Sequence, residues 1–272
     1  MNISRTVRAV ALASVALLLG ACATAPAPPP AATGPEQTKA VLWVGNSFFY
    51  YNNSMHGHVG QLITASTMPD KTGQRSVSVT ISGSGMNWHD MESHFKPNGV
   101  GSYSFDSGNN VVFNTFTKPF DVVLMMDCSQ CPIHPQLKTV FAEYSKKNSD
   151  IVRKYGARPA FFMSWAYADK PEMTEQLAAA YTNAGRIHNA LVVPAGLAFA
   201  ASIKARPELN LYVADKRHPS LAGTYLAACT VLAALYKTSP EGNPYTAGLD
   251  PATAKFLQSV AWQTVQDYAP RR

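Results

Sequence analysis

The feature that most constrains this fold is an alternation of short apolar runs with longer amphipathic stretches. The clearest run, residues 120–126, is almost entirely apolar, as expected for a parallel strand buried on both faces. The stretch that follows, residues 136–155, has the length and period of a helix. Repetition of this strand–helix unit predicts a three-layer α/β/α sandwich with a central parallel sheet.

The expected strands are residues 40–44, 77–81, 120–126, 159–165 and 192–194. The expected helices are residues 59–66, 136–155, 171–191, 197–204 and 219–236, the last taken as the final apolar helix. We expect strand 40–44 to lie centrally, and a site at the carboxyl ends of the strands. Residues 97–114 are rich in Gly, Ser and Asn and break the pattern, which indicates either a β-excursion or a lid near the site.

The N-terminus has the pattern of a targeting segment. Arg5 and Arg8 precede an apolar stretch, residues 9–19, that is too short to span a bilayer comfortably. Small residues then lead directly to Cys22, which resembles a bacterial lipobox. We therefore expect a lipoprotein signal peptide at residues 1–21 and lipidation of Cys22. The alternative is an ordinary signal peptide followed by a chance cysteine.

An Ala/Pro-rich segment, residues 22–38, follows as a tether. Such a composition predicts a stiff, extended spacer of about 3 Å per residue where it is polyproline-like. It would separate a single domain, residues 39–272, from the membrane. Ala23 after the lipidated cysteine favours the outer membrane of a Gram-negative cell envelope.

The composition and charge of the chain argue against two classes of protein, namely disordered proteins and nucleic-acid-binding proteins. Hydrophobic residues make up 46% of the chain and charged residues 15%, which excludes general disorder. Removing residues 1–21 takes away two arginines and no acid, so the net charge falls from +6 to +4. The chain has no basic run or basic helix, so we expect no nucleic-acid partner.

Two short segments about 170 residues apart supply the groups that serine hydrolysis requires. In the first, Val41-Leu42-Trp43-Val44-Gly45-Asn46-Ser47, a strand ends in glycine and then serine. The second places Asp215 three residues before His218. Together they offer a nucleophile, a base and an orienting carboxylate. The residues after Ser47 do not clearly begin a helix, which disfavours a mere capping role for this serine. Pro219 suits the first position of the next helix.

These two motifs resemble those of the SGNH (GDSL-like) hydrolase superfamily, and Gly45-Asn46-Ser47-Phe48 resembles its GNSF-type branch. The resemblance implies a flavodoxin-like α/β/α fold and an esterase with catalytic Ser47, Asp215 and His218. It implies no cofactor and no metal. Asn46 stands where the family usually has aspartate.

The resemblance also implies an oxyanion hole. Its donors would be the backbone N–H of Ser47 and that of Gly83, with Gly85 less well placed. The family's third donor is an asparagine side chain, but here the sequence reads Met126-Asp127-Cys128-Ser129-Gln130-Cys131-Pro132. Ser129 or Gln130 would then donate in its place.

Several other side chains leave alternatives open. Cys128 and Cys131 form either a local disulfide or two free thiols. His56 and His58 have no acidic or cysteine partner nearby in the sequence, so we expect them at the surface rather than at a metal. His89 and His94 lie near Asp90 and Glu92, but we expect no metal there either. Trp165 and Tyr167 lie at a strand end, where they would line a sugar-sized pocket or belong to the rim of the core.

The sequence therefore predicts a secreted, lipid-anchored serine esterase acting on O-acetyl or other short-chain esters, with acylated carbohydrate as its leading substrate. The alternative is a non-catalytic envelope lipoprotein that uses the same fold as a carbohydrate- or protein-binding scaffold. The departure from the family at residues 126–132 favours that alternative, while the intact Ser47, Asp215 and His218 disfavour it.

Overall fold

The computed structural model describes residues 38–268, which belong to one compact unit, Gln37–Arg272. The predicted signal peptide, Cys22 and nearly all of the predicted tether lie outside the described residues. All members of the hydrophobic core fall between Val41 and Ala261, within this unit. Among the described helices, none is both long and apolar enough to span a membrane.

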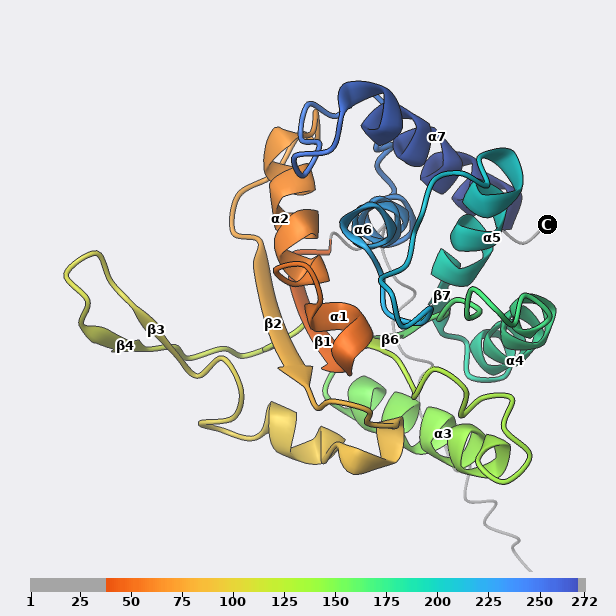
Figure 1. The fold of residues 1–272 in the computed structure, drawn as a ribbon. Helices are drawn as coiled ribbons and strands as arrows, with labels where there is room; N and C mark the ends of the chain where they lie inside the picture. Colours follow the sequence, from red (N-terminus) through yellow and green to blue (C-terminus); the bar gives the residue numbers. More distant parts are fainter. Residues whose placement is uncertain (1–37, 269–272) are drawn as a thin grey trace, which may run out of the picture. The chain divides into compact units, whose positions relative to one another are not determined.

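The core of the fold is a five-stranded parallel sheet with the order β2-β1-β5-β6-β7 (Figure 1). Its strands are β1 (Ala40–Gly45), β2 (Arg75–Thr80), β5 (Val122–Met125), β6 (Arg158–Phe162) and β7 (Leu191–Val193). Counted along this sheet alone, the order is the flavodoxin-like 2-1-3-4-5. The predicted fold class is confirmed. We expected the first strand to lie centrally. Strand β1 is interior, because β2 forms the edge beside it, but the middle strand of the sheet is β5.

Helices cover both faces of the sheet, as strand–helix alternation requires (Figure 1). They are α1 (Ser47–Tyr50), α2 (Met55–Ala65), α3 (Lys138–Lys154), α4 (Met173–Ile187), α5 (Ala195–Ala205), α6 (Leu221–Tyr236) and α7 (Pro251–Tyr268), with the short 3₁₀ helices η1 (Met86–Trp88) and η2 (Met91–Phe95). Helix α6 packs against α2, α5 and α7. It is therefore apolar on all sides and almost wholly buried.

The prediction that α6 is the final helix was wrong, because α7 follows it. The buried face of α7 includes Thr253, Ala254, Gln258, Ala261 and Thr264. Small and polar residues on that face weaken the hydrophobic period by which a helix is recognised from sequence.

The irregular segment after β2 contains a β-excursion. Strands β3 (Tyr103–Phe105) and β4 (Val111–Phe113) form an antiparallel hairpin that belongs to no larger sheet. Figure 1 shows the hairpin projecting from the side of the sheet where the edge strand β2 lies.

Candidate active site

Ser47 is presented by a sharp turn at the end of β1. A Cβ on Gly45 would lie 2.9 Å from the Phe49 ring, so the turn requires glycine. Asn46 is extended and caps α1, its side-chain oxygen accepting a hydrogen bond from the Phe48 N–H at 3.3 Å. The expectation that no helix begins here was wrong. The cap, however, is Asn46, which leaves the Ser47 hydroxyl free for other contacts.

The amide of Asn46 explains why asparagine stands at this position. Its Nδ2 donates to the backbone oxygens of Ser84 at 2.9 Å and Asp127 at 3.1 Å, and the residue is only 3% exposed. An ionised aspartate has no proton to donate and would face both carbonyls with its charge. Asn46 thus ties together the three loops that follow β1, β2 and β5.

The structure brings Ser47, His218 and Asp215 together in the order that proton transfer requires. The Ser47 Oγ lies 2.8 Å from Nε2 of His218, and Nδ1 of His218 lies 2.5 Å from Oδ2 of Asp215. An ionised carboxylate can only accept, so Nδ1 carries the proton and Nε2 is free to accept the serine proton.

The Asp215 carboxylate is held in its charged form. Partial burial acts to raise its pKa. Hydrogen bonds from the His218 side chain and from the backbone N–H groups of His218 and Arg217 outweigh that effect and lower the pKa to about 2. The orienting group therefore keeps its charge across the neutral and mildly acidic range.

Hydrogen bonds from two neighbouring segments fix the backbone around His218. The indole N–H of Trp165 donates to the Arg217 oxygen at 2.9 Å, and Nδ2 of Asn52 donates to the Pro219 oxygen at 2.9 Å. The Tyr51 ring stacks on the imidazole at a centroid distance of 4.2 Å. Trp165 itself is fully buried in the core, which rules out the pocket alternative for this residue.

Pro219 does not occupy the first position of α6, contrary to the sequence prediction. The helix begins at Leu221, and Ser220 is its N-cap, accepting from the Gly223 N–H at 3.3 Å. Pro219 lies before the cap, where its fixed φ restricts the backbone next to His218.

The first two predicted oxyanion donors lie on adjacent loops. Ser47 N–H begins α1 and has no hydrogen-bond acceptor among residues 38–268. Gly83 lies in the turn after β2 with φ +72°, a conformation that favours glycine. Its neighbour Ser84 accepts from Asn46, and Ile81 N–H donates to the Gly45 oxygen at 3.0 Å, so this turn is fixed to the nucleophile loop.

The two candidates for the third oxyanion donor, Ser129 and Gln130, lie on the loop after β5 and differ in their hydrogen bonds. Ser129 Oγ is engaged with the Tyr167 hydroxyl at 2.7 Å. The half-buried side-chain amide of Gln130 makes no hydrogen bond with any residue that the structure describes. Gln130 therefore has a free donor. The Ser129 O–H is free only where the Tyr167 hydroxyl donates in their contact.

The same loop is held by a buried acid. Asp127 is 2% exposed, and its Oδ1 accepts from the backbone N–H of Cys128 at 2.7 Å and of Met86 at 3.1 Å. Burial raises its pKa to about 6, although the two backbone hydrogen bonds oppose that rise. Asp127 thus links the loop after β5 to the loop after β2.

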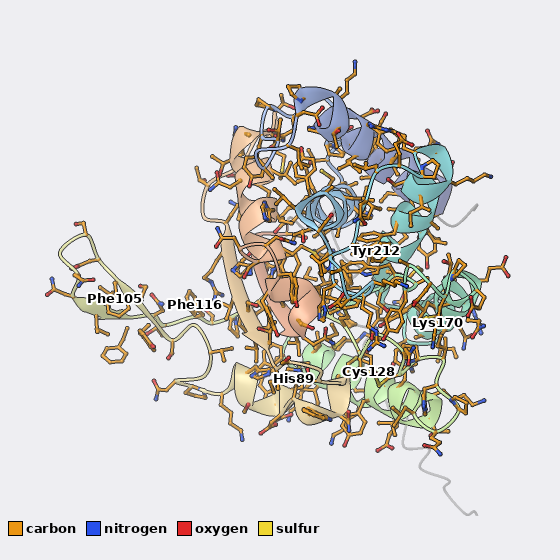
Figure 2. All side chains as sticks on the ribbon, viewed as in Figure 1. His89, Phe105, Phe116, Cys128, Lys170 and Tyr212 are labelled. Carbon is orange, nitrogen blue, oxygen red and sulfur yellow. A yellow bond between two sulfur atoms is a disulfide. The ribbon has the colours of Figure 1, made fainter. Side chains whose placement is uncertain are left out.

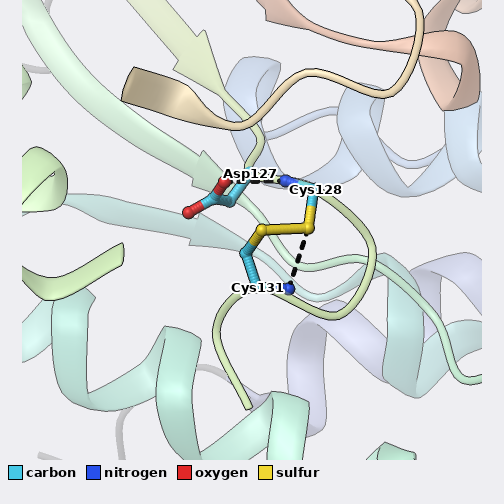
Figure 3. A group of neighbouring side chains, drawn as sticks. All are labelled: Asp127, Cys128 and Cys131. Atoms are coloured by element: carbon cyan, nitrogen blue, oxygen red, sulfur yellow. Dashed lines mark hydrogen bonds between the residues drawn. A yellow bond between two sulfur atoms is a disulfide. The ribbon is translucent and has the colours of Figure 1, made fainter. Parts of the chain in front are cut away.

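Cys128 and Cys131 form a disulfide, which decides between the two alternatives for this CxxC pair (Figure 3). The bond closes a small ring around Ser129 and Gln130. Asp127 lies beside the two sulfurs, but in this form neither cysteine offers a thiolate to a metal.

The prediction that His58 lies at the surface was also wrong. It is 7% exposed, and its ring nitrogens contact the Tyr245 hydroxyl and the Asn52 oxygen, each at 2.7 Å. His89 is buried too, with Nε2 at 3.0 Å from Ser84 Oγ, and burial lowers its pKa to about 4. Both histidines support the loops near Ser47.

Tyr167 lines a cavity of about 650 Å³, together with Ala166, Glu172, Phe199 and Tyr212 among others. No triad residue lines this cavity.

The sequence analysis did not predict two residues that hold His218, namely Tyr51 and Asn52. Both follow Ser47 closely in the chain, and that proximity was the only available signal.

No protein-family model matches the chain, and a search of curated proteins gave no match. Solved structures do resemble it. A candidate SGNH hydrolase from Slackia heliotrinireducens is 21% identical with a TM-score of 0.52, covering 73% of this chain and all of that one. A DUF4886 family protein from Bacteroides uniformis is 18% identical with a TM-score of 0.57, covering 85% of this chain and 95% of that one.

A candidate GDSL-like lipase from Parabacteroides merdae is 12% identical with a TM-score of 0.53, covering 73% of this chain and 95% of that one. At these identities the likeness concerns the fold. The chain has the SGNH (GDSL-like) hydrolase fold, as the sequence predicted.

Proposed function

We propose that this protein is a serine esterase that hydrolyses acyl esters. The observation that carries the proposal is the continuous hydrogen-bonded line from Ser47 Oγ through His218 to Asp215. The fold places this line at the carboxyl ends of the strands, where ligands bind in open α/β sheets. Proteins of the same fold include candidate hydrolases and lipases.

The geometry supports a two-step mechanism. Ser47 Oγ attacks the ester carbonyl while His218 Nε2 accepts the serine proton, and Asp215 stabilises the imidazolium that forms. The negative charge on the carbonyl oxygen would be met by the N–H groups of Ser47 and Gly83 and by the Gln130 amide.

As the tetrahedral intermediate collapses, His218 returns the proton to the leaving alcohol, and an acyl group remains on Ser47. Water then attacks the acyl-enzyme by the same route and releases the acid. The triad side chains and one water molecule balance the two steps.

The decisive experiment is labelling with a fluorophosphonate probe, which reacts only with an activated serine. Wild type and Ser107→Ala are expected to label, and Ser47→Ala is not. Ser107 is an exposed serine of the hairpin with no role in the site. Absence of label on wild type would support the binding-scaffold alternative.

Short-chain esters, including O-acetyl groups on carbohydrate, are our proposed substrates. An acyl series from acetyl to palmitoyl on one leaving group tests this choice. A rate that falls with chain length supports it, while a rate that rises toward palmitoyl favours lipid esters. This experiment depends on catalysis and is therefore run after labelling.

We also propose that Cys22 carries the lipid anchor and places the domain at the cell envelope, in the outer membrane. This rests on the sequence pattern of residues 5–22. Three acyl chains anchor stably, because each buried CH₂ contributes about 0.8 kcal/mol. Cells fed a fatty-acid analogue should label wild type and not Cys22→Ser. Equal label on both would refute the anchor.

A further inference from the structure

The projecting hairpin carries an exposed apolar face, and its strands join no other sheet among residues 38–268. Residue pairs Tyr103–Phe113 and Phe105–Val111 stand directly opposite each other. Opposed residues, and residues two apart in a strand, share one face. These four side chains are 57%, 76%, 61% and 52% exposed, respectively. Figure 2 shows Phe105 out on the hairpin, away from the body of the domain.

The hairpin has a defined shape. Asp106 Oδ1 accepts from the backbone N–H groups of Gly108 and Asn110, each at 2.9 Å, and so orders the turn. At the base, Asn114 N–H donates to the Ser102 oxygen at 2.7 Å. The exposed face is therefore presented by ordered backbone, at little entropic cost to a contact it makes.

The base of the hairpin lies where the predicted tether joins the domain. The Arg75 guanidinium lies 4.0 Å from the centroid of the Phe116 ring, and the Arg75 N–H donates to the Lys39 oxygen at 2.8 Å. Thr38, the first described residue, directly precedes Lys39. The hairpin and the membrane tether thus attach to the domain at neighbouring points.

From these observations we infer that the hairpin face, made by Tyr103, Phe105, Val111 and Phe113, lies against the surface of the lipid bilayer to which the chain is anchored. Aromatic and aliphatic side chains favour the interface between head groups and acyl chains. The inference rests on the envelope location proposed above, not on the esterase activity.

Because the tether keeps the domain near the bilayer, even a weak contact between the hairpin face and lipid would suffice to hold the hairpin there. Residues 23–37 would reach up to about 45 Å if fully polyproline-like, at about 3.1 Å per residue. Tethering confines the hairpin face to within that range of the bilayer and so raises its local concentration there. A face with modest affinity for lipid would then be occupied for much of the time.

The size of the face argues against a second copy as its occupant. Three aromatics and one valine at these exposures present on the order of 500 Å². A stable protein interface needs about 800 Å² from each partner. A bilayer sets no such requirement, because it deforms around each inserted side chain.

Contact by this face would orient the active site. Lys39 lies at the start of β1, and Ser47 follows its end. The base of the hairpin contacts Arg75, which pairs with Ala40 at the start of β1. The site at the opposite end of the strand would therefore open away from the membrane. Substrates would then arrive from the surrounding envelope.

Vesicle sedimentation tests the inference. The protein is the chain from Ala23, which lacks the acyl anchor and retains the whole compact unit, and the vesicles are phosphatidylethanolamine with phosphatidylglycerol. Phe105→Ser with Phe113→Ser should weaken binding at least tenfold. The matched control, Ile187→Ser with Ile203→Ser, also removes two exposed apolar side chains, on α4 and α5, and should bind as wild type does.

Three results would overturn the inference. They are equal binding by the hairpin variant and wild type, binding that high salt abolishes, and a wild-type dimer in light scattering that the hairpin variant loses. Circular dichroism and fluorophosphonate labelling verify that each variant is folded. Labelling is expected in all of them, so loss of vesicle binding is distinguished from failure of the esterase proposal.

Discussion

The candidate site has two halves, the catalytic triad and the loop after β5, and they are held in place by different kinds of interaction. The triad side keeps the residue types that the chemistry demands, and its members contact one another directly. The loop after β5 lacks the asparagine that the sequence resemblance implies, and it is held by a disulfide and by the buried carboxylate of Asp127. The triad can therefore be recognised by its side chains, whereas the loop after β5 can be recognised only by the interactions that restrain its backbone.

The difference follows from what each half must supply. Proton transfer needs a hydroxyl, an imidazole and a carboxylate in a fixed order. Stabilising an oxyanion needs only N–H groups aimed at one point, and backbone or amide groups serve equally well. Sequence can therefore change in the second half provided that the loop stays rigid.

The largest effect is expected on the triad side. Ser47→Ala should lower kcat by about 10⁴-fold or more, since triad members act as a unit. Stability should change little, because the helix cap is Asn46. Steady-state kinetics on an acetyl ester, with Ser107→Ala as control, measures this. Unchanged turnover in the purified variant would reject Ser47 as the nucleophile.

How much of the fold and of the site could be predicted from sequence depends on whether the signal is local in the chain. Residues 120–126 predicted β5 because a fully buried strand is apolar throughout. The Asp-x-x-His spacing located Asp215 and His218 because the residues lie on one short loop. By contrast, the Asn46 contacts with Ser84 and Asp127 join segments 38 and 81 residues apart. No local pattern encodes such contacts.

On the donor side, Gln130→Ala should lower kcat by about 10²–10³-fold with a smaller change in KM, because a donor acts most as negative charge develops. Ser129→Ala is the matched control, since its hydroxyl is already engaged with Tyr167. A large loss in Ser129→Ala alone would reverse this assignment. If neither variant loses rate, the third donor lies elsewhere.

Asn46 joins the two halves, so Asn46→Asp should damage both. The carboxylate would face two carbonyl oxygens and leave them without donors, at a cost of about 2–4 kcal/mol. The loss should lessen at acid pH, where the new side chain is protonated. Urea unfolding measures it. Asn189→Asp, at an exposed asparagine, should stay within about 0.5 kcal/mol of wild type.

The disulfide should have a smaller influence, confined to the donor side. Cys128→Ser with Cys131→Ser frees the loop around Gln130 without removing any donor, so kcat should fall by less than the roughly 10²-fold loss of a donor. Labelling of Ser47 by fluorophosphonate should persist. Cys229→Ser, at the buried free cysteine, should leave kcat unchanged. Full activity in the double variant would show that Asp127 restrains the loop alone.

The smallest expected effect is a pH dependence of stability due to Asp127. Its folded-state pKa of about 6 exceeds the value of about 3.9 for an unfolded aspartate. Between these values the folded protein keeps a proton that the unfolded chain has lost. Stability from this group is therefore full below about pH 4 and declines as pH rises to about 6.

Asp127→Asn retains an acceptor for the N–H groups of Met86 and Cys128 but removes the titration. Relative to wild type, the variant should gain about 1–3 kcal/mol between pH 4 and pH 8, because wild type alone carries the cost of a buried charge at the higher pH. Urea titrations at both values measure the difference. Asp267→Asn, at an exposed carboxylate, corrects for loss of charge alone. A constant difference across the two pH values would mean that Asp127 ionises normally and that its two hydrogen bonds, rather than its charge, hold the donor loop.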